Sequence, residues 1–354
     1  MTEPATGPTT PTAGGVRLAD LTTLRVGGPA SDVVQATDEA ALVGAVAAAD
    51  ADGIPVLVVA GGSNLLVADE PVADRVVLVR TRGVHVEADR CGGAYVSVAA
   101  GEDWDELVGR AVDAGWVGIE ALAGIPGSVG ATPVQNVGAY GQEVAQTIAT
   151  VRTWDRGQRR QRTFANADCG FGYRTSRFKA EPGRFLVLEV TFQLPLGDLG
   201  APIGYDQLAR ALGADPGQRR PLADVRAAVL ALRAGKGMVL DSGDHDTWSA
   251  GSFFTNPLLS SDDADRLPAD APRWPTGDGR VKTSAAWLIE HAGFGRGHGD
   301  GPAKISTKHT LALTNRGAAT SADLLALARE VREGVRATFG VELVNEPVLV
   351  NCSL

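Results

Sequence analysis

Three short groups of residues in this chain carry side chains that could do chemistry. In the first, Arg174 follows Tyr173 in a turn that glycines loosen. In the second, Ser252 precedes two phenylalanines, and in the third, Glu346 precedes Pro347 near the C-terminus. A guanidinium binds a carboxylate in a planar fork, and hydroxyl or carboxyl groups can exchange protons. Taken singly, each group also fits a structural role, as a surface ion pair, a turn or a strand edge.

The segment over 118–141 is a candidate ligand-binding stretch. Six of its 24 residues are glycine and two are proline, which excludes a stable helix because each interior glycine costs about 1 kcal/mol relative to alanine. Its apolar residues, such as Ile119, Leu122 and Val129, favour burial. A buried irregular backbone must pair its N–H and C=O groups. Either a ligand closely wrapped by glycines or a packed series of tight turns would satisfy them.

A second loop follows the β-rich run over 55–60, which stops at Gly61, Gly62, Ser63 and Asn64. Successive backbone N–H groups in such a turn can point at one phosphate. A simple hairpin turn is the alternative reading of the same four residues.

Composition narrows the class of protein. The 354 residues allow two or three domains, and the hydrophobic share of 44% is that of an ordinary globular protein. The net charge of −9 argues against a nucleic-acid or membrane-surface partner. Three distant cysteines imply no disulfide framework, and no spacing typical of a structural metal site occurs. With no long apolar run and no signal pattern, a cytoplasmic location is expected.

The elements that must position these groups follow from apolar periodicity and capping residues. Asp38 is expected to cap a helix over 39–51, and Ser321 a helix that runs to 339 and ends at Gly340. A domain boundary is expected at Gly235, and a disordered tail over 1–15. The basic run over 156–162 indicates a solvated hairpin tip. Further helices are expected over 102–114, 221–234 and 283–292, and strands over 55–60, 76–79, 95–100, 150–154, 188–194 and 341–350.

Standard dinucleotide, nucleotide-phosphate and serine-hydrolase fingerprints are absent from the sequence. The groups that are present resemble, in their order, the UDP-N-acetylenolpyruvoylglucosamine reductase family, flavoenzymes that complete UDP-N-acetylmuramate for bacterial peptidoglycan. The resemblance covers about residues 16–350, and seven motifs in one order are far more specific than any single motif. These motifs lie at 23–28, 61–66, 118–141, 173–174, 251–257, 304–309 and 345–347.

The resemblance implies an α+β fold, in which a two-subdomain FAD-binding lobe of the vanillyl-alcohol-oxidase/PCMH type is followed by an α+β substrate-binding lobe. The expected FAD-binding subdomains are 16–85 and 86–234, with a mobile tyrosine loop at about 198–220, and the substrate lobe is 235–354.

The resemblance also implies FAD as a cofactor and NADPH as the hydride donor. The flavin is expected to be non-covalent, because no His or Cys that could tether it lies between residues 53 and 82. The matching cofactor-binding residues are Arg25, Gly61, Gly62, Ser63, Asn64, Gly124, Ile125, Pro126, Gly127, Ser128, Gly130, Asn136 and Gly138.

In the family, NADPH gives hydride to the flavin N5, which then gives hydride to the β-carbon of the enolpyruvyl group. The resulting enolate must be stabilised at the carboxylate and protonated at the α-carbon. Arg174 matches the cation at the carboxylate, Ser252 the proton donor, and Glu346 the group that polarises the enolate. Because a free serine is a very poor acid, Ser252 would need a cationic neighbourhood and an ordered relay.

The implied substrate is UDP-N-acetylglucosamine-enolpyruvate, and the implied protein is a monomer. Tyr205 matches the tyrosine of a loop that folds over the diphosphate in one subclass. Two departures are visible, since residues 237–250 match no version of the family and His309 stands where some members have Gln. The matching substrate-binding residues are Tyr140, Tyr173, Tyr205, Lys236, Asn256 and His309.

Two other functions are compatible with parts of the pattern. Another FAD-dependent oxidase on the same scaffold would often tether its flavin through His or Cys, which the pyrophosphate loop here lacks. A catalytically dead UDP-sugar-binding protein would be expected to lose Arg174, Ser252 or Glu346, and all three are present.

Overall fold

The computed structural model describes residues 15–89 and 91–354, so the tail predicted over 1–15 lies outside the described residues except for Gly15. The chain forms two compact units. Unit 1 contains Ala30–Gly61 and Ala73–Arg233, and unit 2 contains Arg17–Pro29, Gly62–Val72 and Ala234–Leu354. Segments 17–29 and 62–72, which the sequence grouped with the first FAD-binding subdomain, therefore belong to the unit that holds the C-terminus.

Unit 1 begins with a small parallel sheet in the order β3-β6-β4, made of Val33–Ala36, Arg75–Val79 and Val56–Val59. Helix α1 (Glu39–Asp52) follows β3. The predicted cap is confirmed, because Oδ1 of Asp38 accepts a hydrogen bond from the backbone nitrogen of Ala41 at 2.8 Å. Gly53 ends this helix in the left-handed conformation.

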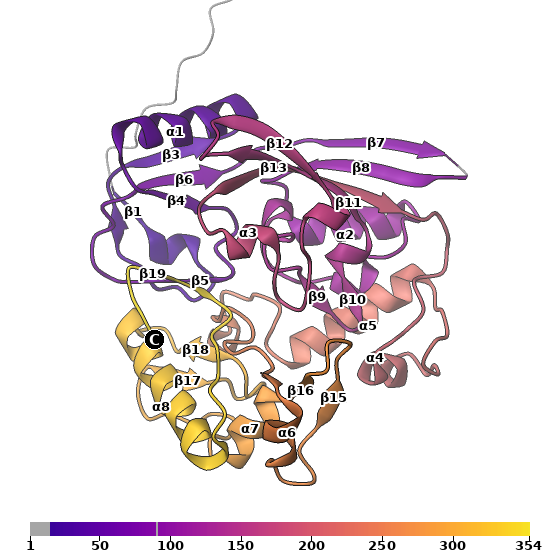
Figure 1. The fold of residues 1–354 in the computed structure, drawn as a ribbon, viewed down its shortest axis with the longest axis vertical. Helices are drawn as coiled ribbons and strands as arrows, with labels where there is room; N and C mark the ends of the chain where they lie inside the picture. The colour runs from indigo at the N-terminus through magenta and orange to yellow at the C-terminus, as the bar shows by residue number, and fades with distance from the viewer. Residues whose placement is uncertain (1–14, 90) are drawn as a thin grey trace, which may run out of the picture. The chain divides into compact units, whose positions relative to one another are not determined.

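The larger sheet of unit 1 is antiparallel, in the order β12-β11-β13-β8-β7 (Figure 1). Helix α2 (Trp104–Asp113) starts from the Asp103 cap, and its Trp104 ring lies 5.9 Å from that of Phe192 in the buried core. The basic run predicted as a hairpin tip over 156–162 does join β11 to β12, but the turn itself is 156–159, and 160–162 open β12. The five strands are Arg160–Ala165, Ile148–Asp155, Phe185–Leu194, Gly93–Ala99 and Val84–Asp89.

The glycine-rich stretch over 118–141 is irregular, as its composition predicts. It contains only the 3₁₀ turns Glu120–Leu122 and Val129–Ala131 and the short strand β9 (Gly138–Ala139), which pairs with β10 (Gln142–Glu143). The carboxylate of Glu120 is wholly buried and accepts hydrogen bonds from the backbone nitrogens of Gly118 and Ala201, both at 2.6 Å. Burial of this backbone is therefore accompanied by internal hydrogen bonds.

The insertion at about 198–220 is closed by its own backbone. Leu222 donates to the carbonyl of Asp198 at 3.1 Å, and Ile203 donates to that of Gln218 at 2.9 Å. The insertion carries helix α4 (Asp206–Ala211), and α5 (Leu222–Gly235) follows it. One further short helix of unit 1, α3, spans Arg177–Ala180.

In unit 2, helix α8 packs against α7 and the β17-β18 sheet, and α6 packs against the β14-β16-β15 sheet. Strand β19 runs parallel to β5 in a third sheet (Figure 1). Its buried core takes Leu24, Val26 and Leu66 from the early segments of the chain. The helices are α6 (Ser261–Asp265), α7 (Ala285–His291) and α8 (Ser321–Phe339). The strands are β5 (Leu65–Val67), β14 (Leu258–Leu259), β15 (Arg273–Pro275), β16 (Val281–Thr283), β17 (Ala303–Ile305), β18 (Leu313–Asn315) and β19 (Val348–Val350), and the short strands Val16–Arg17 and Pro29–Ala30 (β1 and β2) flank the start of the unit.

Two sequence predictions in unit 2 are wrong. The cap of α8 is Thr320 rather than Ser321, because Asp69 takes both the backbone nitrogen and the hydroxyl of Ser321, at 2.6 and 2.8 Å. The strand predicted over 341–350 is reduced to β19, since only Val348–Val350 pairs with a neighbour as a strand. Within the described ranges, no helix has the length and apolarity needed to cross a bilayer.

Candidate functional site

Two glycine loops of unit 1 meet backbone to backbone. Gly61 follows β4, and Gly127 lies in the irregular stretch with a φ of 128°. A Cβ placed on Gly61 would lie 2.5 Å from the Cα of Gly127 and 3.3 Å from the backbone nitrogen of Ser128. No side chain fits at that distance, so the close approach requires glycine. The structure thus brings together two loops that the sequence predicts to bind a cofactor.

Ser128 is a buried polar residue beside this contact. Its side chain is 5% exposed, and its Oγ has no hydrogen-bond partner among residues 15–89 and 91–354. A buried hydroxyl without a partner costs about 1–3 kcal/mol, which a bound acceptor would remove. Side-chain-free backbone and an unpaired hydroxyl fit a group rich in acceptor oxygens, such as the diphosphate of FAD. Ile125 and Pro126 complete the loop and are half-buried.

A buried arginine that the sequence did not single out lies against the same stretch. Arg233, near the end of α5, is only 8% exposed, and its Nε lies 3.4 Å from where a Cβ on Gly124 would be. Burial lowers the pKa of Arg233, whereas charge interactions with Tyr140 and Asp105 act to raise it. Burial also raises the pKa of Tyr140, and the positive charge of Arg233 acts to lower it. Arg233 therefore places a buried positive charge against the stretch that the sequence predicts to bind a cofactor.

The guanidinium of Arg174 is hydrogen-bonded to the backbone of the irregular stretch over 118–141. Its Nη2 donates to the carbonyl of Gly138 at 2.8 Å, and its Nη1 donates to that of Asn136 at 3.5 Å. The backbone of Arg174 is left-handed, with a φ of 50°, and its carbonyl accepts from Nζ of Lys179 at 3.0 Å. These contacts fix the fork of Arg174 beside the predicted cofactor-binding residue Gly138.

Two of the predicted cofactor-binding residues have structural partners inside unit 1. The side-chain amide of Asn136 donates to Oε2 of Glu143 at 2.8 Å and to the carbonyl of Gly172 at 3.1 Å. Gly130 faces Ala100, the residue after β8, and a Cβ on Gly130 would lie 2.5 Å from the Ala100 Cβ. Both donors of the Asn136 amide are therefore engaged, and the absence of a side chain at Gly130 is already explained by packing.

Two predicted substrate-binding tyrosines lie together in unit 1. The ring of Tyr205 is edge-on to that of Tyr140, with 5.6 Å between centroids and 87° between planes. Tyr205 is 44% exposed, whereas Tyr140 is buried with a φ of 49°. Tyr173 lies next to Arg174 in the chain, and the Arg174 guanidinium is 5.7 Å from the centre of the Tyr173 ring.

In unit 2, the second half of the Gly61–Asn64 loop is fixed by the segment before β2. A Cβ on Gly62, whose φ is 61°, would lie 1.8 Å from the carbonyl oxygen of Leu21. Thr23 donates its backbone N–H to the carbonyl of Gly62 at 3.2 Å and its hydroxyl to that of Ser63 at 3.4 Å. The loop therefore has a defined conformation that only glycine permits at position 62.

Arg25 is held at both its backbone and its side chain. The buried amide of Asn315 donates to the carbonyls of Leu24 and Arg25, at 3.1 and 3.2 Å. The Arg25 guanidinium lies 5.8 Å from the centre of the Trp248 ring, a cation–π contact. Trp248 belongs to the segment over 237–250 for which the sequence had no explanation.

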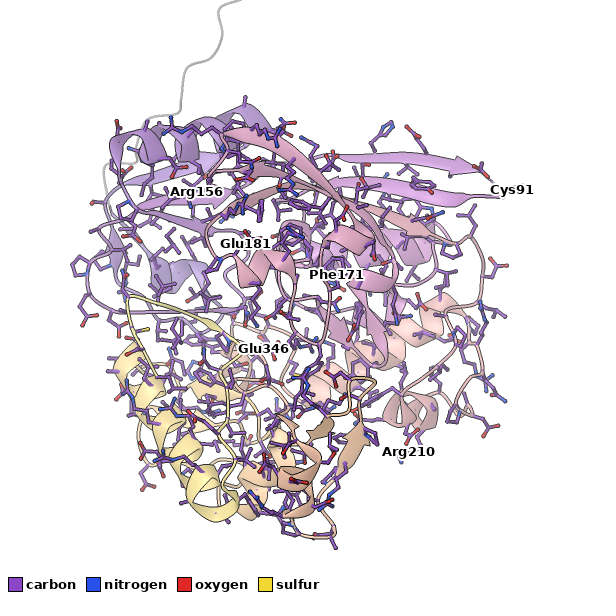
Figure 2. The ribbon with its side chains drawn as sticks, viewed as in Figure 1. Cys91, Arg156, Phe171, Glu181, Arg210 and Glu346 are labelled. Atoms are coloured by element: carbon purple, nitrogen blue, oxygen red, sulfur yellow. The ribbon has the colours of Figure 1, made fainter. Side chains whose placement is uncertain are left out.

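Ser252 and Glu346, far apart in sequence, are brought together in unit 2. The backbone nitrogen of Glu346 donates to the carbonyl of Phe253 at 2.8 Å, and Phe253 donates to the carbonyl of Leu311 at 2.7 Å. Phe253 is itself buried, so it anchors the serine that precedes it. Glu346 lies on the extended segment that leads into β19 (Figure 2).

The predicted cofactor loop joins this pair through Asn64. Its Nδ2 donates to the carbonyl of Glu346 at 3.3 Å, and its own carbonyl accepts from Val348 at 2.9 Å. Asn64 thus orders the backbone on both sides of Pro347. The structure thus connects Asn64 to Glu346 through a side-chain amide, and Glu346 to Phe253, the residue after Ser252, through the backbone.

The remaining predicted substrate-binding residues of unit 2 lie at turns and caps. Oδ1 of Asn256 accepts from the backbone nitrogen of Ala285 at 2.9 Å, at the start of α7. His309 donates its backbone N–H to Oγ of Ser306 at 3.3 Å. Lys236 immediately precedes Gly237, which has a φ of 65°. No group of three or more His, Cys, Asp or Glu that could hold a metal occurs in the described chain.

Comparison with known families defines the class. The FAD binding domain family matches residues 30–158, which include the Gly61 and Gly127 loops. The family described as UDP-N-acetylenolpyruvoylglucosamine reductase, C-terminal domain, matches residues 243–350, which include Ser252 and Glu346. An FAD-binding domain joined to a reductase domain makes the protein an FAD-dependent oxidoreductase.

Individual relatives specify the family. UDP-N-acetylenolpyruvoylglucosamine reductase of Cutibacterium acnes is 56% identical over 98% of this chain and 93% of its own length. The enzyme of Thermobifida fusca is 55% identical over 98% of this chain and 100% of its own. The crystal structure of the reductase from Thermus caldophilus superposes with a TM-score of 0.63 at 28% identity, covering 95% of this chain and 98% of that one. The chain belongs to the UDP-N-acetylenolpyruvoylglucosamine reductase family.

These matches confirm the predicted α+β fold with an FAD-binding lobe and the assignment as an oxidoreductase. They imply FAD as the cofactor, with NADPH as its reductant. They give no roles to individual side chains, so the site residues, the subdomain limits and the tyrosine lid stay predictions. Arg233 and Asp246, which is buried in the 237–250 segment, were missed because a single Arg or Asp in a helix or a turn gives no sequence signal of burial.

Proposed function

We propose that this protein reduces the enolpyruvyl ether of UDP-N-acetylglucosamine-enolpyruvate to UDP-N-acetylmuramate, a precursor of peptidoglycan. The names of its relatives support this substrate. The observation that carries the proposal is the backbone bridge that places Glu346 beside the Ser252 segment, because a proton donor and a carboxyl group must act on neighbouring atoms of one substrate. The net charge of −9 gives no support to a nucleic-acid partner, and we expect a cytoplasmic monomer.

The FAD would be held by the loops in which glycine is required. In unit 1 these are the loops of Gly61 and Gly124–Gly130, with the Ser128 hydroxyl and the Arg233 guanidinium as polar partners. In unit 2 they are Gly62 to Asn64, with Arg25. Bound at these loops, FAD would supply the hydride chemistry between NADPH and the β-carbon of the substrate.

Arg174 binds and orients the substrate carboxylate in this proposal. Its guanidinium is already fixed by the carbonyls of Gly138 and Asn136, so little side-chain entropy is lost when it binds. A planar fork matches the two carboxylate oxygens, and its charge stabilises the enolate that forms when the β-carbon gains hydride.

Ser252 gives the proton to the α-carbon, and Glu346 polarises the developing enolate. Ser252 lies between Gly251, with a φ of 72°, and the buried Phe253, so its backbone position is set on both sides. The proton must come from the hydroxyl and be replaced from solvent after each turnover. Substrate anchoring is assigned to Tyr140, Tyr173, Tyr205, Lys236, Asn256 and His309.

Anaerobic rapid mixing tests the proposal. NADPH should bleach the oxidised flavin band of the purified holoprotein, and the enolpyruvyl substrate should then restore it with formation of UDP-N-acetylmuramate, seen by mass spectrometry. Bleaching that the substrate cannot reverse would exclude this reaction.

A further inference from the structure

The turn over 244–247 belongs to the segment over 237–250, whose sequence matches no version of the family. Its central residue, Asp246, is 5% exposed, which is unusual for a carboxylate. Oδ1 of Asp246 accepts from Nη1 of Arg316 at 2.6 Å and from the backbone nitrogen of Thr307 at 3.0 Å. The Thr307 hydroxyl donates to Oδ2. A buried charge with this many partners fixes the elements that supply them.

A second carboxylate of the turn binds the same loop. Asp244 caps the turn through Oδ1, which accepts from the backbone nitrogen of Asp246 at 2.9 Å. Its Oδ2 pairs with Nζ of Lys308 at 2.5 Å. The two carboxylates therefore engage consecutive residues, Thr307 and Lys308, and His309 comes next in the chain.

The same turn also contacts the start of the third segment of unit 2, Ala234–Leu354. A Cβ on Gly237 would lie 3.0 Å from the carbonyl oxygen of Asp246 and 3.4 Å from Cδ of Lys308. Gly237 immediately follows Lys236. One turn thus connects the segment that carries Lys236 with the loop that carries His309, and both residues are assigned to substrate anchoring above.

We propose that Asp246 is a positioning residue that sets the geometry of Lys236 and His309 for the nucleotide-diphosphate part of the substrate. The inference rests on the proposed function, because it concerns the same substrate. Asp246 does not touch the reacting atoms in this proposal. It acts by keeping the 306–309 loop and the Lys236–Gly237 corner in one arrangement.

The Asp246→Asn variant tests this role. Asparagine has nearly the same shape, but its neutral amide forms no ion pair with Arg316, and it replaces one acceptor oxygen with an NH₂ group that can only donate. Loss of charged hydrogen bonds of this kind corresponds to a change of about 10- to 100-fold. We expect KM for the enolpyruvyl substrate, and the Kd of UDP-N-acetylmuramate measured by calorimetry, to rise by such a factor. The FAD content and the rate of flavin bleaching by NADPH should stay at their wild-type values.

The matched control is Asp278→Asn in the same unit. Asp278 also bonds an arginine and a threonine, through Oδ2 to Arg280 at 2.8 Å and Oδ1 to Thr276 at 2.6 Å, but in an exposed turn. Its variant should keep the wild-type KM and Kd.

Three results would overturn the inference. These are an unchanged KM and Kd in Asp246→Asn, an equal loss in both half-reactions, or the same loss in the Asp278→Asn control. Should Asp246→Asn fail to fold, Asp244→Asn replaces it, because it removes the carboxylate paired with Lys308, and it should raise the same two constants. A wild-type protein that bleaches with NADPH but never turns over the enolpyruvyl substrate would instead refute the proposed function, so the two failures are distinguishable.

Discussion

Replacing Ser252 with alanine separates the two halves of the proposed cycle. Flavin reduction by NADPH needs no proton at the substrate α-carbon, whereas completion of the second half-reaction does. The substitution removes one hydroxyl and leaves the chain path unchanged. The neighbouring hydrogen bonds, from Phe253 to Leu311 and from Glu346 to Phe253, are backbone contacts that need no side chain at position 252.

The size of the two effects follows from this arrangement. Because the anchoring contacts survive, we expect the free energy of unfolding to fall by no more than about 1–2 kcal/mol. Loss of a positioned acid costs about 10²–10⁴-fold in rate, which corresponds to roughly 3–5 kcal/mol in the barrier. The kinetic effect should therefore clearly exceed any effect of stability.

Stopped-flow absorbance at the oxidised flavin band measures each half separately. The Ser252→Ala protein should bleach with NADPH close to the wild-type rate and reoxidise with the enolpyruvyl substrate 10²–10⁴-fold more slowly. The control is Ser261→Ala, which removes an exposed hydroxyl 3.5 Å from the carbonyl of Gly279 in the same unit. Cysteine at 252 should restore part of the rate, since a thiol is the stronger acid. Wild-type reoxidation by Ser252→Ala would show that water or another side chain is the donor, and the assignment would be refuted.

Three further outcomes are expected. Acid precipitation should release all of the yellow colour into the supernatant, because the pyrophosphate loop has no His or Cys to tether FAD; colour in the pellet would contradict this. Tyr205→Ala should raise KM for the substrate and spare flavin reduction, since the exposed Tyr205 ring rests on Tyr140 only at its edge; equal damage to both half-reactions would indicate a structural role. Arg174→Lys should slow reoxidation at least about tenfold, because an ammonium cannot form a planar fork, and an unchanged rate would argue against carboxylate binding.

The sequence was sufficient to predict features that depend only on residues close together in the chain. The Asp38 cap and the left-handed Gly340 at the end of α8 depend on residues within one helical turn, and both predictions are confirmed. The irregular backbone over 118–141 also follows directly from its glycines and prolines.

The predictions that failed depend on distant partners. Thr320 and Ser321 are adjacent hydroxyl residues, and only the contact of Ser321 with Asp69 decides which one caps α8. Residues 341–347 read as strand from their sequence, but Asn345 makes only an isolated antiparallel bridge to Phe254, whereas Val348–Val350 pairs continuously with β5. The burial of Arg233 and Asp246 likewise comes from packing between segments that the sequence does not connect.

The division of the chain has a consequence for its synthesis. Leu24, Val26 and Leu66 leave the ribosome early, but their packing partners in unit 2, such as Leu324 and Val331, are made last. Strand β5 must likewise wait for β19, only a few residues from the C-terminus. The early segments therefore stay without their native cover through most of translation, and a fragment cut at residue 234 would carry them permanently exposed. To express the two units separately, residues 17–29 and 62–72 should be joined to the C-terminal half. This requires a permuted gene, because a simple truncation would separate them.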